Sequence, residues 1–336
     1  MSRRRTLTRL AGGMAGLAAP LAAPLAAPWA TRSARAQGFP DQPVKMIIGF
    51  PPGGTVDTIG RLIAPPLSAQ LGQPVVIDTR PGAAGLVAME GLARARPDGH
   101  SIVLGSAGAL VVMPHLLPGM PYDPLRDFAP VSHVVSTPQL LVVGKHVPAG
   151  SVAELVALAR ARPGKLTFGS TGHGSTLHLA GELFRLKAGI DLLHVPYRGG
   201  APAVTALLAG EIDMLLVDIP VVMPHVRTGE FRPLALAAAR RIDALPEVPT
   251  VAEAGVEGVV CEGWYGVFAP AGTPPERVAV LQRAVAATLA DAGTRQALAA
   301  LGGVPRSSTP PQLMEHVRDE HARWGEVVRA AQVRLN

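Results

Sequence analysis

The sequence is poor in cysteine, which limits both its chemistry and the ways it can be stabilised. Cys261 is the only cysteine in 336 residues, so no disulfide can form within the chain. No cysteine stands near the N-terminal segment to carry a lipid anchor. Stability must therefore come from packing, and we expect Cys261 to be a small buried side chain rather than a reactive thiol.

Outside the N-terminal segment, the chain has no excess of basic over acidic residues. Six of the 31 lysines and arginines fall in residues 1–36, which contain no acidic residue, so 25 basic residues face 25 acidic ones in the remainder. The formal charge of +6 thus belongs to the leader, and the rest of the chain has no basic excess with which to bind nucleic acid.

The leader lacks the long, strongly apolar run of a membrane anchor. A basic start is followed by an alanine-rich stretch that three prolines interrupt, whereas a membrane span needs about 20 apolar residues. A small-residue site ends at Ala36, so residues 1–36 are expected to be a cleaved export signal. Arg3 and Arg4 partly match a twin-arginine signal although Thr6 does not, which leaves the export route open. The mature protein is expected to be soluble in the periplasm.

From residue 40 onward, short β-branched runs alternate with alanine- and leucine-rich segments of helical period, which predicts an α/β fold. The expected strands are 44–50, 74–80, 101–106, 128–144, 165–170, 191–197, 213–219, 231–239 and 261–272. The expected helices are 58–72, 85–99, 151–164, 175–189, 201–212, 277–293 and 310–332. Pro65 and Pro66 are expected to disturb the first helix.

This order predicts two doubly wound α/β domains. The chain is expected to cross near 137–142 and to return near 260–266, which makes a hinge of two crossings with the ligand cleft between the domains. Domain 1 would then comprise 37–139 and 264–336, and domain 2 would comprise 140–263. A strictly sequential pair of domains is the open alternative.

Glycine-rich loops between strands and helices are the places where such folds bind ligands, because helix N-termini present free N–H groups there. The loops are FPPGGTVD (50–57), RPGAAG (80–85), GSAGA (105–109), GSTGHGST (169–176), YRGG (197–200) and VDIP (217–220).

Several catalytic and cofactor motifs are missing from these loops. The spacing of Gly169 and Gly174 resembles a phosphate loop, but the lysine is absent, and neither a dinucleotide fingerprint nor a nucleophile elbow occurs. His173, His178 and His194 lack a neighbouring carboxylate cluster, so they are expected to be structural or exposed rather than metal ligands. An enzymatic interpretation would rest only on the hydroxyl-rich GHGST segment. We expect no catalytic residue, no cofactor and no metal.

The loops are rich in N–H and hydroxyl donors and poor in charge, which suits a carboxylate. The expected donors are Gly53, Gly54 and Thr55 on one side of the cleft and Ser170, Gly174, Ser175 and Thr176 on the other. Asp57, in the first turn of a helix, is also explained as a cap and dipole partner.

The ordered motifs resemble the substrate-binding proteins of tripartite tricarboxylate transporters, the TctC or Bug family. The resemblance covers essentially the whole mature chain. It is carried by FPPGGTVDTIGRLIAPPLSAQLGQPVVIDTRPGAAG, PDGHSIVLGS, KLTFGSTGHGSTLHLAGELF, HVPYRGGAPAVTALLAGEID, LPEVPTVAEAG and WYGVFAPAGTP.

The resemblance implies a periplasmic binding protein of type II-like fold. Such a protein would be a monomer without enzymatic activity that delivers a dicarboxylate, aromatic acid or amino acid to a permease with a large and a small subunit. The alternative is an extracytoplasmic sensor that signals to a sensor kinase of a two-component system. The residues implied in ligand binding are Phe50, Gly53, Gly54, Thr55, Asp57, Ser170, Gly174, Ser175 and Thr176, with Tyr197, Arg198 and Asp218 at the cleft edge. Arg198 has an alternative role as a structural pairing residue.

The chain departs from the family pattern at a few positions that bear on ligand identity. Thr79 replaces an asparagine, Ala84 replaces a glycine, and His100 stands where an aromatic residue is common. The segment 217–220 also lacks the usual phenylalanine before Asp218. We therefore expect relatives to be a weak guide to the ligand.

Overall fold

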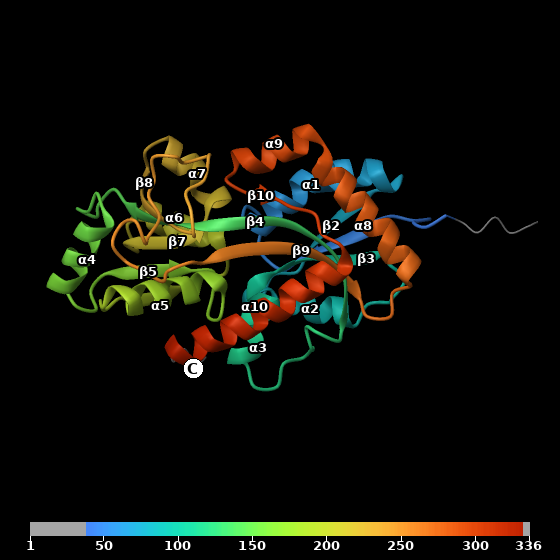
Figure 1. Ribbon diagram of the computed structural model, residues 1–336, viewed down its shortest axis with the longest axis horizontal. Coiled ribbons are helices and arrows are strands. Elements are labelled where there is room, and N and C mark those ends of the chain that lie inside the picture. The colour runs from blue at the N-terminus through green and yellow to red at the C-terminus, as the bar shows by residue number, and fades with distance from the viewer. Residues whose placement is uncertain (1–37, 332–336) are drawn as a thin grey trace, which may run out of the picture. The chain divides into compact units, whose positions relative to one another are not determined.

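The computed structural model describes residues 38–331, so the expected export signal at 1–36 lies outside the described residues. Strands and helices alternate along most of the described chain (Figure 1). The strands are β1 (Val44–Ile48), β2 (Val75–Thr79), β3 (Ser101–Ser106), β4 (Phe128–Gly144), β5 (Thr167–Ser170), β6 (Leu193–Pro196), β7 (Met214–Asp218), β8 (Phe231–Ala237), β9 (Glu262–Pro270) and β10 (Val304–Pro305).

The α-helices are α1 (Thr55–Leu71), α2 (Leu86–Ala93), α3 (Met113–Leu116), α4 (Val152–Ala161), α5 (Thr176–Ala188), α6 (Gly200–Ala209), α7 (Ile219–Arg227), α8 (Pro275–Ala290), α9 (Ala292–Ala300) and α10 (Pro310–Ala331). Two shorter elements, η1 (Ala83–Gly85) and the π-helical η2 (Gly108–Val112), lie in the loops that follow β2 and β3.

The first three strands form the parallel arrangement expected of a doubly wound half. β1 lies between β2 and β3, with Ile47 opposite Asp78 on one side and Val103 on the other. Met46 and Ile48 pack with apolar residues of α1, whereas Ile47 packs with those of α2. Because both faces of β1 are covered, its sequence is a nearly continuous apolar run rather than an alternating one.

β4 connects two groups of strands. Its first part, 128–138, pairs antiparallel with β9, and its last part, 139–144, lies between β7 and β8. The strand order is β2-β1-β3-β9-β4-β7-β5-β6, and β8 and β10 also pair with β4. Figure 1 shows β4 and β9 side by side. The chain thus enters the second group of strands through β4 and leaves it into β9, while the exact domain boundaries stay a prediction.

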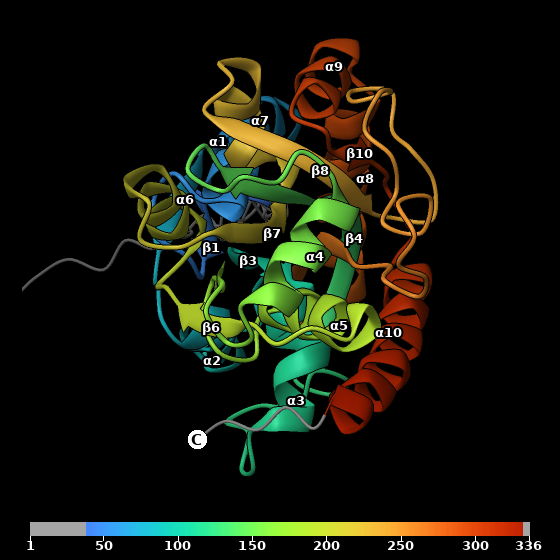
Figure 2. The same cartoon turned by 90° about the vertical axis from the view of Figure 1, so that its left-hand side faces the viewer.

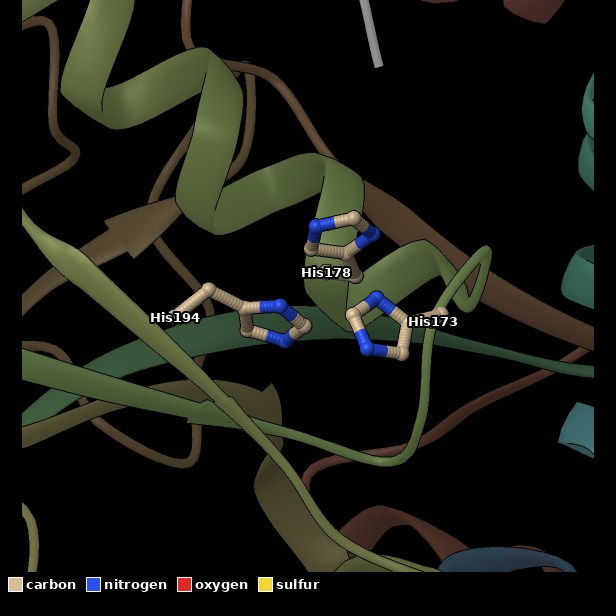
Figure 3. Close-up of side chains that lie close together, drawn as sticks. All are labelled: His173, His178 and His194. Atoms are coloured by element: carbon tan, nitrogen blue, oxygen red, sulfur yellow. The ribbon is translucent and has the colours of Figure 1, made fainter. Parts of the chain in front are cut away.

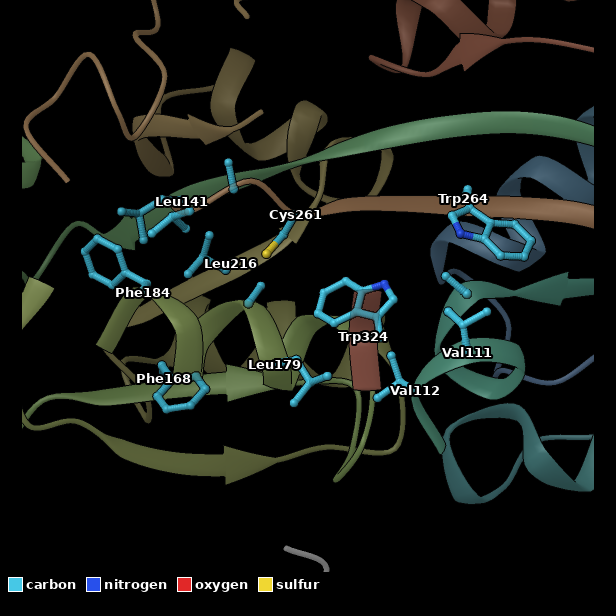
Figure 4. Close-up of a cluster of buried hydrophobic side chains, with 14 of the residues drawn as sticks. Val111, Val112, Leu141, Phe168, Leu179, Phe184, Leu216, Cys261, Trp264 and Trp324 are labelled. Atoms are coloured by element: carbon cyan, nitrogen blue, oxygen red, sulfur yellow. The ribbon is translucent and has the colours of Figure 1, made fainter. Parts of the chain in front are cut away.

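Helices cover both faces of the sheet (Figure 2). On one face α1 and α8 pack on the first strands, and α6 and α7 pack on the second group. On the other face a larger cluster joins apolar side chains of α2, η2, α4, α5 and α10. Figure 4 shows Trp324 of α10 in this cluster with Val112, Leu179 and Cys261. The last helix therefore contributes to a core that joins strands of both groups, from β1 to β5.

The cysteine lies where the sequence suggested. Cys261 is fully buried in this core, and burial raises the pKa of its thiol to about 12. The expected burial of this side chain is confirmed, and its lack of reactivity stays a prediction.

The helices differ from expectation at a few places. α1 continues through Pro65 and Pro66, which lie on its less buried side, so the prolines remove two N–H donors without ending the helix. α3, α7 and α9 were not expected. In α7, Pro220 near the start is compatible with a first helical turn. Pro224 lies inside the helix, and a proline there argues against a helix in the sequence. Among the described residues, no helix is both long and apolar enough to cross a membrane.

Candidate functional site

Two cavities lie beyond the carboxyl ends of β1, β3, β5 and β7, where helices begin. The inner cavity has a volume of about 30 Å³. It is lined by Phe50, Gly54, Thr55, Val56, Ala84, Ser106, Gly108, Thr171, Ser175, Thr176, Leu177, Gly200, Val217, Asp218 and Tyr265. The outer cavity has a volume of about 650 Å³ and shares Phe50, Ala84 and Thr171 with the inner one. The two therefore adjoin.

Asp57 fixes the conformation of the loop after β1, which borders the inner cavity. Gly53 adopts φ +81°, and its N–H donates to Asp57 Oδ2 over 3.0 Å. Arg61 Nε donates to Asp57 Oδ1 over 2.8 Å. Both carboxylate oxygens are thus occupied within the loop and helix, so Asp57 positions Gly54 and Thr55 rather than lining the cavity.

The loop after β5 is held by hydroxyl and imidazole groups. Ser170 is fully buried, and its Oγ accepts from the Gly172 N–H over 3.1 Å. Ser175 caps α5, since its Oγ accepts from the His178 N–H over 3.2 Å. These bonds place Thr171 and Thr176 at the wall of the inner cavity.

Three helix N-termini present free backbone N–H groups to the inner cavity. α1 and α6 have no side-chain cap, and the cap of α5 satisfies only the His178 N–H. Within residues 38–331, the hydrogen bonds include no acceptor for five N–H groups that line this cavity. The residues that line the cavity and carry these N–H groups are Thr55, Val56, Thr176, Leu177 and Gly200. Because the loss of a buried N–H's hydrogen bond is costly, five such donors around one cavity indicate an anion site.

A buried carboxyl lies at the same cavity. Asp218 ends β7 and is 2% exposed, and it accepts a hydrogen bond from the phenol of Tyr265. Burial raises the pKa of Asp218 to about 6, against the opposing effect of the hydroxyls of Tyr265, Thr55 and Thr137. Burial and the neighbouring carboxyl also raise the pKa of Tyr265 well above its ordinary value, so the phenol stays protonated. No lysine or arginine of the described chain lines this cavity.

The outer cavity has a different chemistry. Its apolar wall is formed by Phe50, Pro51, Pro81, Leu86, Met113, Leu117 and Pro196. His173, Tyr197 and Arg198 also line it, and no aspartate or glutamate of the described residues does. Arg198 is exposed and belongs to none of the ion pairs found within residues 38–331, so the alternative role of Arg198 as a structural pairing residue has no carboxylate partner there.

Three histidines gather at the loop after β5 (Figure 3): His173 belongs to the loop, His178 to α5 and His194 to β6. The rings of His178 and His194 are stacked, with centroids 4.0 Å apart, and His173 stands edge-on to both. One nitrogen from each ring lies within 4.8 Å of the others. A tetrahedral zinc site needs nitrogens about 3.4 Å apart with the ion in the plane of each ring. Stacked rings direct their lone pairs in parallel planes, so the rings as placed do not form a coordination sphere.

The stacked histidines instead hold the loop. His178 Nδ1 accepts from the Gly174 N–H over 3.2 Å, and His194 Nε2 lies 2.7 Å from Ser170 Oγ. Burial and the neighbouring histidines lower the pKa of His178 to about 3 and that of His194 to about 4. Both rings are therefore neutral at neutral pH.

The structure brings together most of the expected ligand-binding residues. Those at the inner cavity are Phe50, Gly54, Thr55, Ser175, Thr176 and Asp218, and those found only at the outer cavity are Tyr197 and Arg198. The remaining four line neither cavity but form hydrogen bonds within the loops after β1 and β5. They are Gly53, Asp57, Ser170 and Gly174.

Tyr265 lines the inner cavity from outside the loops that the sequence singled out, and Thr171 and Gly200 lie within those loops but were not named as ligand-binding residues. Tyr265 lies in the middle of β9, and its one available signal is that a tyrosine in a buried strand needs a partner for its hydroxyl. Ala84, noted as a departure from the family pattern, has φ +54°, a backbone conformation that glycine adopts more easily.

The family model described as "Tripartite tricarboxylate transporter family receptor" matches residues 59–333. The chain belongs to this receptor family. Protein BugT of Bordetella pertussis is 38% identical over 301 residues, which cover 89% of this chain and 92% of BugT. The expected membership of the TctC or Bug family is confirmed.

Solved structures of such receptors share the fold. The R. palustris protein Rpa4515, described with adipate, has a TM-score of 0.86 and 38% identity, and the match covers 88% of this chain and 99% of that one. MatC of Rhodopseudomonas palustris, described with bound malate, has a TM-score of 0.82 and 33% identity, over 86% of this chain and all of MatC. The expected α/β fold of a periplasmic binding protein is confirmed, and the receptor family is one of solute-binding proteins, not enzymes.

Proposed function

We propose that this receptor captures a small organic carboxylate in the inner cavity, in the periplasm, and delivers it to a membrane permease with a large and a small subunit. The observation that carries the proposal is the set of five backbone N–H groups, from three helix N-termini, that line one cavity without an acceptor in the described chain. A carboxylate supplies the missing acceptors and also interacts favourably with the three helix dipoles.

The energetics suit reversible capture. A hydrogen bond to a charged group contributes about 1.5–3 kcal/mol, and a helix N-terminus adds about 0.3–1 kcal/mol. Four or five such contacts reach the roughly 8 kcal/mol of micromolar affinity after the cost of ordering ligand and loops. A basic side chain in the inner cavity is not required, which agrees with the absence of lysine and arginine from its described lining.

Related receptors support a carboxylate as the ligand. The descriptions of Rpa4515 and MatC name adipate and malate, both of which carry two carboxylates. Both proteins match this chain over nearly their whole length, so the same loops are available to hold one carboxylate here.

Isothermal titration calorimetry with a panel of organic acids tests the proposal. At least one acid is expected to bind with micromolar or better affinity and to raise the melting temperature. The proposal fails if no acid binds while nucleotides or metal ions do. Mass spectrometry of what co-purifies with the protein would extend the panel to acids not chosen in advance.

Transport and signalling are separated by a gene deletion. If the receptor feeds a permease, deletion abolishes uptake of the labelled acid. Unchanged uptake together with a lost transcriptional response to the acid would instead assign the protein to a sensor kinase. The size of the exported protein, measured by intact mass, tests cleavage after Ala36.

A further inference from the structure

The small size of the inner cavity bears on the identity of the ligand. Its volume of about 30 Å³ is room for about two water-sized groups, that is, for the two oxygens of one carboxylate. A second carboxylate close to the first would also lie near Asp218, whose own charge is already disfavoured by burial. The remainder of the ligand must therefore extend into the adjoining outer cavity.

The outer cavity favours an apolar chain over a polar one. Its volume of about 650 Å³ is in the range of small-molecule sites. Phe50, Leu86, Met113 and Leu117 form much of its wall. A hydroxyl or ammonium group on the ligand would lose hydrogen bonds to water against this wall, whereas methylene groups would gain from burial.

The outer cavity also holds the cationic group that the inner one lacks. Arg198 comes from the loop before α6, and the guanidinium has no carboxylate partner within the described residues. His173 comes from the loop before α5, and its ring is held edge-on against His178 and His194. A planar guanidinium can bind a carboxylate with two parallel hydrogen bonds, and an imidazole N–H can add a third donor.

We propose that the outer cavity recognises the far end of the ligand, so that the protein selects a dicarboxylate whose two carboxylates are separated by an unbranched apolar chain. One carboxylate lies in the inner cavity, and the other pairs with Arg198 and His173. This inference rests on the proposed carboxylate-receptor function and narrows its ligand class. Short or hydroxylated diacids, and amino acids, are the classes that it excludes.

Calorimetry with matched acids tests the inference. Adipate and octanedioate are compared with hexanoate and octanoate, which have the same chain lengths but one carboxylate, and with succinate and malate. Each long diacid is expected to bind about 10- to 100-fold more tightly than its monoacid, because a charge-assisted pair with Arg198 is added. Succinate and malate are expected to bind more weakly than adipate.

Variants assign the gain to Arg198. In Arg198→Ala, most of the difference in affinity between adipate and hexanoate should be lost, with His173 keeping a remainder, while hexanoate affinity stays unchanged; Arg198→Lys should restore part of the difference. Arg162→Ala removes an exposed arginine of the α4 end and should change neither acid.

Three results would overturn the inference while leaving the receptor function standing. They are equal affinity for hexanoate and adipate, tighter binding of malate than of adipate, and an equal loss of both acids in Arg198→Ala. Failure of every acid to bind would overturn the proposed function as well.

Discussion

The phenol of Tyr265 donates a hydrogen bond to the carboxyl of Asp218, and both side chains line the inner cavity. They come from β9 and β7, which lie on either side of β4 in the sheet. Asp218 and Tyr265 are 2% and 6% exposed. An ionisable carboxyl thus lies beside the place proposed for an anionic ligand, and we expect this arrangement to couple ligand binding to pH.

Carboxylate affinity is expected to rise as the pH falls from 8 toward 6. Burial raises the pKa of Asp218 to about 6, and an anion nearby raises it further, so the complex takes up a proton. A further rise of one unit corresponds to about a tenfold gain in affinity. Calorimetry of hexanoate, which has no second carboxylate for His173 to bind, measures the gain at the two pH values, and Asp218→Asn should remove it. A pH dependence that persists in the Asn variant would contradict the assignment.

The free energy of unfolding of the ligand-free protein should also depend on pH because of Asp218. The folded pKa of Asp218, about 6, lies above the ordinary value of 3.8, so folding favours the protonated form. The ionised carboxyl therefore costs stability above about pH 6, and this cost disappears as the pH falls toward 4. Asp218→Asn should stabilise the protein by up to about 3 kcal/mol at pH 8 and by little at pH 4. Urea unfolding at both pH values checks this, and a destabilised Asn variant at pH 8 would contradict it.

Gly54→Val is expected to abolish carboxylate binding without unfolding the protein. Gly54 has φ −79°, which valine tolerates, and a Cβ there would lie 3.5 Å from Pro51 O and 4.0 Å from Gly200 N. The added methyl groups would then cover N–H donors of α1 and α6. Circular dichroism should be unchanged, and affinity should fall at least 100-fold, the loss of about two charged hydrogen bonds.

Gly38→Val is the matched control for that substitution, since no atom lies within 4 Å of a Cβ there. It should leave affinity unchanged. Normal binding by Gly54→Val would show that the ligand does not occupy the inner cavity.

Cys261 should resist thiol reagents in the folded protein. The side chain is fully buried, and burial raises the pKa of its thiol to about 12, so almost no thiolate is available at pH 8. A chromogenic disulfide reagent should label one thiol in urea and none in buffer. Rapid labelling of the native protein would mean that the segment just before β9 opens locally.

The order of strands and helices could be predicted because local chemistry decides it. The run 101–106 and the long run 128–144 have the bounds of β3 and β4, since both are largely apolar and the second lies between Asp127 and Lys145. α7 was missed because its prolines argue against a helix. Its packing against β8 and α6 outweighs the effect of the prolines, and such tertiary contacts cannot be seen in the sequence. A periodicity cannot show how strands far apart in the sequence are ordered.

The residues of the candidate site that belong to local motifs could also be predicted, whereas those brought together by the order of strands could not. Thr55 and Thr176 could be found because each opens a helix after a glycine-rich loop. Tyr265 could not, because its approach to Asp218 depends on β9 and β7 flanking β4, with Val135 opposite Tyr265 and Gln139 opposite Asp218. Asp57 and Gly174 were placed at the ligand by their loops, but the structure shows them bonded within those loops.

The loop after β5 should depend on a single imidazole nitrogen. His178 is 5% exposed, and its Nδ1 accepts from the Gly174 N–H. His178→Phe keeps a flat ring beside His194 but leaves that N–H without an acceptor, at a cost of about 1–3 kcal/mol. We expect lower stability, faster hydrogen exchange of the Gly174 amide, and weaker carboxylate binding because Thr176 and its neighbours lose their position. His178→Asn, whose side-chain oxygen can take the place of Nδ1, should protect the Gly174 amide although it removes the ring. If that amide exchanges equally slowly in the Phe variant and in the native protein, the stack itself, and not the hydrogen bond, holds the loop.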